Sequence, residues 1–199
     1  MKKKESAYLF IDGTNLYAGQ YELFGPEKYL DFGKFIQEIQ ESLTVQFEKI
    51  LFYASYSPKP GKPTRKQKAY LKNEGLFYKR VRDTKGVTFF RGYRSPTSGK
   101  EKEVDVQLAV DIVHLAHLNR FNTLFLFSGD ADFMHVLQIA ESLQKNVRIL
   151  AIENRIPRRF TFNYQTILCL FSSGKSLKLE KSQKISMVKL SKEELLQGA

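Results

Sequence analysis

The sequence predicts an α/β fold in which a doubly wound, mainly parallel β-sheet carries helices on both faces. Short apolar runs of strand length alternate with longer segments whose apolar residues recur at helical spacing. One of the runs, residues 123–128, is apolar almost throughout, as expected of a parallel strand covered on both faces. With 199 residues, of which 42% are hydrophobic, the chain is long enough to bury the core of one such domain.

Six elements are predicted in the first half of the chain. The apolar run before Asp12 and the run KILFYA predict buried strands, and a stripe of apolar residues every three or four positions predicts a helix between them. Thr64 is a suitable N-cap for a short basic helix, and Gly75 lies just past its end. Two β-rich runs follow. In chain order these elements span residues 7–11, 32–43, 49–54, 65–73, 76–81 and 87–93.

Five elements are predicted in the second half. A clear helical stripe of apolar residues precedes the apolar strand, and a second helix, a strand rich in branched residues and a last strand follow it. In chain order they span residues 104–118, 123–128, 133–143, 146–152 and 166–172. The last strand ends a predicted domain at residues 1–171. The Lys- and Ser-rich residues 172–199 predict a flexible or loosely docked tail, with a short helix at residues 191–197.

Composition limits the compartment and the partners. The chain has 32 Lys and Arg against 21 Asp and Glu, a formal charge of +11, which favours polyanions such as nucleic acid. No apolar run reaches the roughly 18 residues of a membrane-spanning helix, and the short apolar start predicts a first strand, not a signal peptide. Cys169 is the only cysteine, which excludes an internal disulfide. We therefore expect a cytoplasmic protein with no membrane partner.

Aspartates stand at three places where a predicted strand ends or a predicted helix begins. Asp12 ends the first strand, Asp105 and Asp111 lie in the helix of residues 104–118, and Asp130 and Asp132 follow the apolar strand. The carboxyl ends of neighbouring parallel strands meet along one edge of a sheet, so distant carboxylates can converge there. The pattern predicts an acidic site at this edge.

Some of these aspartates can be explained by a structural role in a turn or a helix cap, without any functional site. Asp12 precedes a glycine and can stand in a turn or cap a helix. Asp132 can cap the helix that follows it, a role compatible with metal binding. Asp130 has no comparable structural explanation. Ser128, which precedes Asp130 by two residues, can hydrogen-bond a carboxylate or a phosphate. It can equally be a surface serine with no role in the site.

The two aspartates of the helix at residues 104–118 are expected to differ in role. Asp105 and Asp111 are six residues apart, and at about 100° per residue they point about 120° away from each other. They cannot both aim straight at one ion. Asp105, near the helix start, is expected to be the ligand, and Asp111 a supporting or salt-bridging group.

Clustered carboxylates repel one another unless a cation neutralises them, and hard oxygen ligands suit Mg²⁺ or Mn²⁺. Such ions activate water, orient a scissile phosphate and neutralise the leaving oxygen. His114, His117 and His135 lack the spacing of a zinc motif and are interpreted as packing or surface residues. A metal-dependent nuclease that cleaves phosphodiester bonds is therefore the leading hypothesis.

The chain resembles the NYN domains, specifically the LabA-like branch of the PIN-like nuclease superfamily. The matching segments occur in family order over residues 7–152 and are YLFIDGTNLY, PTRKQKAYL, GKEKEVDVQLAVDIVHLA, LFLFSGDADFMHVLQIA and NVRIL. The resemblance implies a PIN-like three-layer α/β/α sandwich and a ribonuclease that depends on Mg²⁺ or Mn²⁺. Carried over to this chain, it implies four acidic site residues, Asp12, Asp105, Asp130 and Asp132. It also implies a positioning role for Asn15, with Ser128 and Asp111 in support.

Basic residues interleaved with aromatic ones predict the RNA-binding surfaces. Cationic side chains contact phosphates, and aromatic rings stack on bases. The first surface, in the segment of residues 55–72, contains Lys59, Lys62, Arg65, Lys66 and Lys68. The second contains Arg155, Arg158 and Arg159, and a third set comprises Lys79, Arg80, Arg82, Arg91 and Arg94. Each set can also be a solvated basic face with aromatic residues buried beneath it.

The residues at specific positions argue against two other functions. A phosphatase with a similar Asp-Gly-Thr turn needs a nucleophilic Asp two positions before the turn, where this chain has Phe10. A dinucleotide-binding fold needs G-x-G-x-x-G after the first strand, which is missing. The stronger alternative is a non-catalytic RNA-binding or regulatory module whose acidic edge binds metal only structurally.

Overall fold

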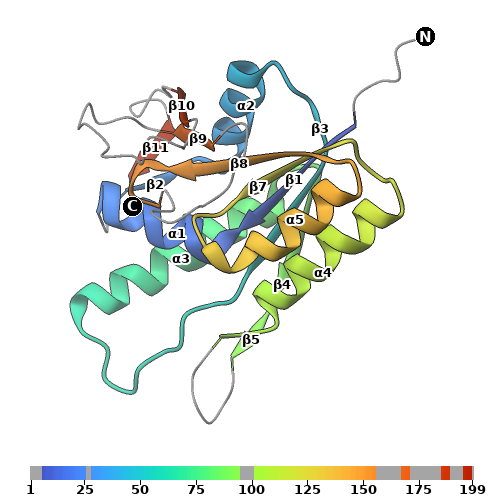
Figure 1. Cartoon of the computed structure of the whole chain (residues 1–199). Helices are drawn as coiled ribbons and strands as arrows, with labels where there is room; N and C mark the ends of the chain where they lie inside the picture. The colour runs from blue at the N-terminus through green and yellow to red at the C-terminus, as the bar shows by residue number, and fades with distance from the viewer. Residues whose placement is uncertain are drawn as a thin grey trace.

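The computed structural model describes residues 6–25, 28–94, 101–155, 167–170, 185–188 and 195–198. Its centre is a seven-stranded sheet in the order β10-β9-β8-β7-β1-β3-β4, in which every neighbouring pair is parallel (Figure 1). The strands are β1 (Ala7–Asp12), β3 (Phe47–Ala54), β4 (Val87–Arg91), β7 (Thr123–Phe127), β8 (Asn146–Ile152), β9 (Ile167–Leu170) and β10 (Ile185–Val188). The mainly parallel α/β sheet expected from the sequence is confirmed.

Five α-helices and two short two-stranded sheets surround this sheet in the described part of the chain. The helices are α1 (Gly13–Phe24), α2 (Phe32–Leu43), α3 (Arg65–Asp83), α4 (Val104–His117) and α5 (Met134–Ser142). Two 3₁₀ turns, η1 (Ala131–Phe133) and η2 (Glu153–Arg155), follow β7 and β8. The short sheets pair β2 (Lys28–Leu30) with β11 (Leu196–Gly198), and β5 (Tyr93–Arg94) with β6 (Glu101–Lys102).

Alternate residues of the central strands fill two hydrophobic cores, because successive side chains of a strand point to opposite faces. Leu9 and Ile11 of β1 pack with residues of α1, α2 and α3. Tyr8 and Phe10 of the same strand pack with residues of α4 and α5. The result is the three-layer α/β/α sandwich that was expected, with α4 and α5 together on one face (Figure 1).

The sheet order reverses between β1 and β7. From β1 the chain passes to β3 on one side, and from β7 it passes to β8 on the other side. Open α/β sheets bind ligands at such a switch point, outside the carboxyl ends of the strands. The residues that follow β1 and β7 are therefore the first place to look for a functional site.

Helix α1 was not expected from the sequence. Its buried face contains Gly13, Gly19 and Gln20 beside Leu16 and Tyr17, so few of its inward residues are strongly apolar. A Cβ atom on Gly13 would lie 2.1 Å from the Phe52 ring of β3, which shows how closely the helix start approaches the sheet. Close approach requires the small residues that conceal the amphipathic pattern.

The prediction of a helix at residues 65–73 followed by a strand at residues 76–81 is wrong. Helix α3 continues through Gly75 to Asp83, and its buried residues Asn73, Glu74, Phe77, Tyr78 and Val81 repeat at helical spacing. Two of these five are polar, so the helical stripe was hidden. The N-cap expected at Thr64 is present, with a reciprocal bond between its backbone and the Gln67 side chain.

Two short pieces of the predicted tail form strands. β10 continues the central sheet in parallel with β9, and β11 pairs antiparallel with β2. The helix expected at residues 191–197 is wrong at its C-terminal end, where residues 196 and 197 belong to β11; residues 191–194 lie outside the described part. The domain boundary at residue 171 stays a prediction. No helix among the described residues has the length and apolar character to cross a membrane.

Candidate active site

Asp12 ends β1 and begins α1. Its Oδ1 accepts a hydrogen bond from the backbone N–H of Asn15 at 2.9 Å, so the carboxylate caps the helix. The side chain stands at the positive end of the helix dipole and is only 5% exposed. The capping role considered from the sequence is therefore real, and it fixes the carboxylate at the switch point of the sheet.

Ser128 connects the end of β7 to the end of β1. Its buried hydroxyl donates a hydrogen bond to Oδ2 of Asp12 at 2.9 Å and accepts one from the backbone N–H of Asp130 at 3.1 Å. One side chain thus holds the first carboxylate and the backbone that carries the second. The serine occupies a specific position in the acidic site, which the sequence left open.

Asp130 caps the 3₁₀ turn that follows β7. Its Oδ1 accepts a hydrogen bond from the backbone N–H of Asp132 at 3.0 Å. The sequence had assigned capping to Asp132 and no structural role to Asp130. The assignment is corrected: the turn starts two residues before the expected helix, so the cap moves to Asp130, and Asp132 lies exposed within the turn.

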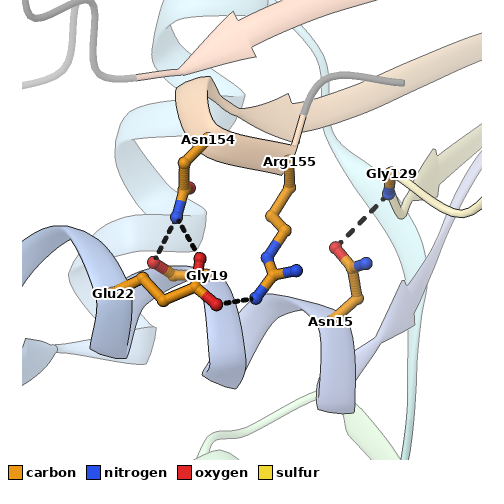
Figure 2. Close-up of polar contacts among 6 residues, drawn as sticks. All are labelled: Asn15, Gly19, Glu22, Gly129, Asn154 and Arg155. Atoms are coloured by element: carbon orange, nitrogen blue, oxygen red, sulfur yellow. Dashed lines mark hydrogen bonds and ion pairs between the residues drawn. The ribbon is translucent and has the colours of Figure 1, made fainter. Parts of the chain in front are cut away.

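Two further groups hold the loop of Gly129 in place. The backbone N–H of Gly129 donates to Oδ1 of Asn15 at 3.3 Å (Figure 2). On its other side, a Cβ atom built on Gly129 would lie 1.7 Å from the carbonyl oxygen of Arg155. Only glycine fits there without a shift of one of the two backbones. The loop is thus enclosed between α1 and η2.

η2 is held against α1 by Arg155, which belongs to the second predicted basic surface, and by Asn154 and Glu22, which were not predicted. Arg155 forms an ion pair with Glu22, and the Asn154 amide donates to the Gly19 carbonyl at 3.0 Å and to Glu22 at 3.1 Å (Figure 2). Asn154 and Glu22 follow no strand-end aspartate and belong to no motif, so no sequence signal distinguished them. Arg155 was expected to bind RNA, and its ion pair with Glu22 was not foreseen. The contacts of these three residues hold η2 against α1, next to the Gly129 loop, and are not part of the acidic cluster itself.

Asp111 lies beside the end of β3, the strand adjacent to β1. Its two carboxylate oxygens accept hydrogen bonds from the Tyr53 hydroxyl and the Gln107 amide, both at 2.8 Å. Burial, and then the hydrogen bond to Asp111, raise the pKa of Tyr53 well above its usual value, so the hydroxyl remains a donor at neutral pH. Tyr53 is the register partner of Asp12, which places this pair next to the first carboxylate.

Asp105 lies in the exposed first turn of α4, six residues before Asp111. At about 1.5 Å per residue, the two positions are about 9 Å apart along the helix axis. Asp105 therefore lies nearer the start of α4 than Asp111, by about 9 Å along the helix axis. The structure brings together Asp12, Asn15, Ser128, Asp130 and Asp132, and it adds Asp111 through Tyr53.

The carboxylates of the site can supply some of the ligands of a magnesium-like ion, but not all of them. Within the described residues, no three His, Cys, Asp or Glu side chains are close enough together to form a metal-binding group. Mg²⁺ is commonly held by one or two carboxylates, with water and substrate phosphate completing its coordination. Asp12 and Asp130, joined through Ser128, offer such a pair of hard oxygen ligands. The four-carboxylate metal site stays a prediction.

A family model for the NYN domain matches residues 6–169 of this chain. The chain belongs to the NYN domain family. Family membership confirms the resemblance found in the sequence and indicates a nuclease-like function with nucleic-acid binding. The LabA-like branch stays a prediction.

One solved structure with the same fold is that of a protein of unknown function from Vibrio parahaemolyticus. It matches 98% of this NYN domain chain and 99% of its own chain, with a TM-score of 0.59 and 17% sequence identity. At that identity the likeness concerns the fold alone. A comparison with curated proteins gave no match.

The basic residues of the first predicted surface lie at the carboxyl edge of this NYN domain. They are exposed, in the loop after β3 and in the first turns of α3, as Lys59, Lys62, Arg65, Lys66 and Lys68. Arg158 and Arg159 lie outside the described residues. In the third predicted set, Lys79, Arg80 and Arg82 lie near the end of α3 and Arg91 ends β4; that they form one surface stays a prediction.

One hollow of the NYN domain lies away from the carboxylates. It lies over α4 and α5, has a volume of about 650 Å³ and is lined by apolar residues and by all three histidines. None of the predicted acidic site residues lines it. The histidines thus gather on an outer helix face, consistent with their interpretation as surface or packing residues.

Proposed function

We propose that this NYN domain is a LabA-like, divalent-metal-dependent ribonuclease that hydrolyses phosphodiester bonds in the cytoplasm. The observation that carries the proposal is the pair of carboxylates Asp12 and Asp130, joined through Ser128 at the switch point of the sheet. Such a pair in a chain of net charge +11 suits a substrate that is itself a polyanion.

Each site residue has a definite task in this proposal. Asp12 and Asp130 would hold Mg²⁺ or Mn²⁺, whose chemistry when bound is to lower the pKa of a water and to neutralise charge on the phosphate oxygens. Ser128 connects the Asp12 carboxylate to the backbone of Asp130, and Asn15 holds the loop at Gly129 between them. Asp132 and Asp105 are exposed and can meet ions that arrive with the substrate, and Asp111 supports the site through Tyr53.

The basic loop and helix start of the first surface are proposed to bind the RNA backbone. Lys59, Lys62, Arg65, Lys66 and Lys68 are exposed near the carboxyl edge to which Asp12 also belongs. Their charges would neutralise phosphates on either side of the bond to be cut, at no cost in buried charge. Positive charge therefore surrounds the acidic pair and offsets its repulsion of RNA.

A non-catalytic RNA-binding or regulatory module is the second candidate. It is favoured by the limited donor set: among the residues described, the carboxylates form no three-ligand group, and both Asp12 and Asp130 already cap helical turns. Aspartates that serve as caps stabilise the fold whether or not a metal binds.

One cleavage assay distinguishes the ribonuclease from the RNA-binding module. Labelled single-stranded and structured RNA are incubated with the full chain and Mg²⁺ or Mn²⁺, and wild type is compared with Asp130→Asn. Asparagine caps helices as well as aspartate does, so this variant removes the charge and keeps the turn. The matched control is Asp31→Asn, which makes the same change at the N-cap of α2, in an element that carries no predicted site residue.

We expect metal-dependent cleavage by wild type and by Asp31→Asn, with a loss of at least about 100-fold in Asp130→Asn, the order of effect of removing a group that stabilises charge at the reacting centre. RNA binding without cleavage in the presence of either metal would establish the binding module instead.

A further inference from the structure

A second hollow lies at the carboxyl edge of the sheet, beyond the ends of β3 and β4. It has a volume of about 240 Å³ and is lined by Tyr56, Ser57, Lys59, Leu71, Glu74 and Arg91. This is smaller than the roughly 300–1,000 Å³ of pockets that enclose a drug-sized ligand. The hollow, here named the Tyr56 pocket, has room for part of a nucleotide.

The walls of the Tyr56 pocket are fixed by contacts within the protein. The Arg91 guanidinium lies 4.9 Å from the centre of the Tyr56 ring, and the Tyr78 ring meets the Tyr56 ring edge-on at 5.3 Å. Glu74 is 2% exposed and accepts hydrogen bonds from Ser57, at 2.9 Å from the backbone N–H and 2.7 Å from the hydroxyl. A ligand would therefore bind to a surface that is already ordered, which lowers the entropy cost of binding.

The register of the sheet places the Tyr56 pocket close to the acidic pair. β3 lies between β1 and β4, with Asp12 opposite Tyr53 and Ala54 opposite Arg91. Neighbouring strands are about 4.8 Å apart, so Arg91 is about 10 Å from Asp12 along the edge. A strand of RNA that meets Asp12 therefore brings a neighbouring nucleotide within reach of the pocket.

The charges of the pocket determine which part of a nucleotide can enter it. A buried carboxylate, Glu74, lines the interior and repels phosphate, whereas Lys59 is exposed and attracts phosphate at the rim. Leu71, Tyr56 and the plane of Arg91 offer the apolar and cationic faces on which nucleobases stack.

We propose that the Tyr56 pocket receives one unpaired base of single-stranded RNA, with the adjoining phosphate held at the rim by Lys59. The proposal rests on the proposed function, since it supplies the substrate class of the same edge. A base in a duplex is stacked and paired, and it cannot enter the pocket unless the duplex opens locally. Single strands and unpaired loops are thus the substrates selected.

The test measures binding, so it does not depend on cleavage. The full chain with Asp130→Asn is titrated by fluorescence anisotropy into single-stranded RNA, into duplex RNA, and into single strands in which one base at a time is removed. We expect tighter binding of the single strand, and a loss of about 5- to 150-fold when one particular base is absent.

Two variants and one control assign that base to the pocket. Tyr56→Ala and, as a milder change that keeps the charge, Arg91→Lys should bind the intact strand more weakly and should no longer respond to removal of that base. Tyr93→Ala is the control, because Tyr93 is an exposed tyrosine that does not line the pocket. It should keep the full response at the same position.

The proposal is overturned if either pocket variant, made in the Asp130→Asn chain, retains the full response, or if the affinity of the Asp130→Asn chain itself is indifferent to which base is removed. Either result can occur in a protein that cleaves RNA, so it leaves the ribonuclease proposal standing. Conversely, a protein that never cleaves RNA but loses the base response in the two variants supports the pocket and contradicts the ribonuclease.

Discussion

Ser128 shows how one small side chain can organise two acidic ones. Its hydroxyl donates to Asp12 and accepts from the Asp130 backbone, so it satisfies a buried acceptor and a donor together. Buried polar groups left without partners cost more than the net gain of making the bond. The serine therefore contributes to the stability of the fold as well as to the geometry of the site.

We predict that Ser128→Ala lowers the free energy of unfolding by about 1–3 kcal/mol, because it removes one hydrogen bond from the buried Asp12 carboxylate and one from the Asp130 backbone N–H. The measurement is urea denaturation, with Ser142→Ala as the control. The Ser142 hydroxyl bonds only a backbone carbonyl within its own exposed helix turn, and its loss should change stability by less than about 0.5 kcal/mol. Equal values for the two variants would show that the bridge contributes nothing.

At the scale of single residues, sequence reasoning located the aspartates that follow strands and named Asn15, Ser128 and Asp111 as support, but it did not foresee the contact of η2 with α1. Asp12 and Asp130 were found because each comes after an apolar run whose end must lie at the sheet edge. The support from Glu22 and Arg155 depends on how η2 meets α1, a contact between positions 133 residues apart. Such a contact leaves no periodic pattern in the sequence.

Among the elements, α2 was predicted with its observed bounds and α3 was not. The inward residues of α2 are uniformly apolar, whereas α3 buries Asn73 and Glu74 within its stripe and contains Gly75. Glu74 is retained at this position because it accepts two hydrogen bonds from Ser57. Buried polar residues interrupt the apolar stripe of α3, and its sequence pattern is weaker for that reason.

Because Gly75 lies inside α3, we predict that Gly75→Ala stabilises the protein by about 0.5–1 kcal/mol. A Cβ atom there would meet no heavy atom within 4 Å, so the gain in helix propensity is not offset by a clash. Thermal unfolding measures the effect. The comparison variant is Gly86→Ala, which should destabilise the protein because the backbone φ of Gly86 is +85°. A lower melting temperature for Gly75→Ala would mean that the helix ends at Gly75 after all.

Across the whole molecule, the positive charge is unevenly placed. α4 and α5 contain no Lys or Arg, although the chain has 32 of them, and they carry Asp105, Asp111 and Glu141. The loop after β3 and the start of α3 are basic and lie at the edge that holds Asp12. A polyanion is therefore expected to approach along this edge and to avoid the outer face of α4 and α5.

This charge distribution predicts the salt dependence of RNA binding. For single strands, the slope of log K against log salt concentration is about −0.7 per neutralised phosphate. Removing three contacting charges with Lys62→Ala, Arg65→Ala and Lys66→Ala should therefore make the slope less negative by about 2. Titrations by fluorescence anisotropy at several salt concentrations measure it.

The matched control removes three exposed charges from the start of β3, the far part of α3 and the turn before β4, with Lys49→Ala, Lys79→Ala and Lys85→Ala. Both triple variants lower the net charge by the same amount, so a general effect of charge would reduce the two slopes equally. If RNA follows the carboxyl edge, only the first variant changes the slope, because counterions are released only where phosphates touch the protein. Equal slopes in the two variants would place the RNA elsewhere on the molecule.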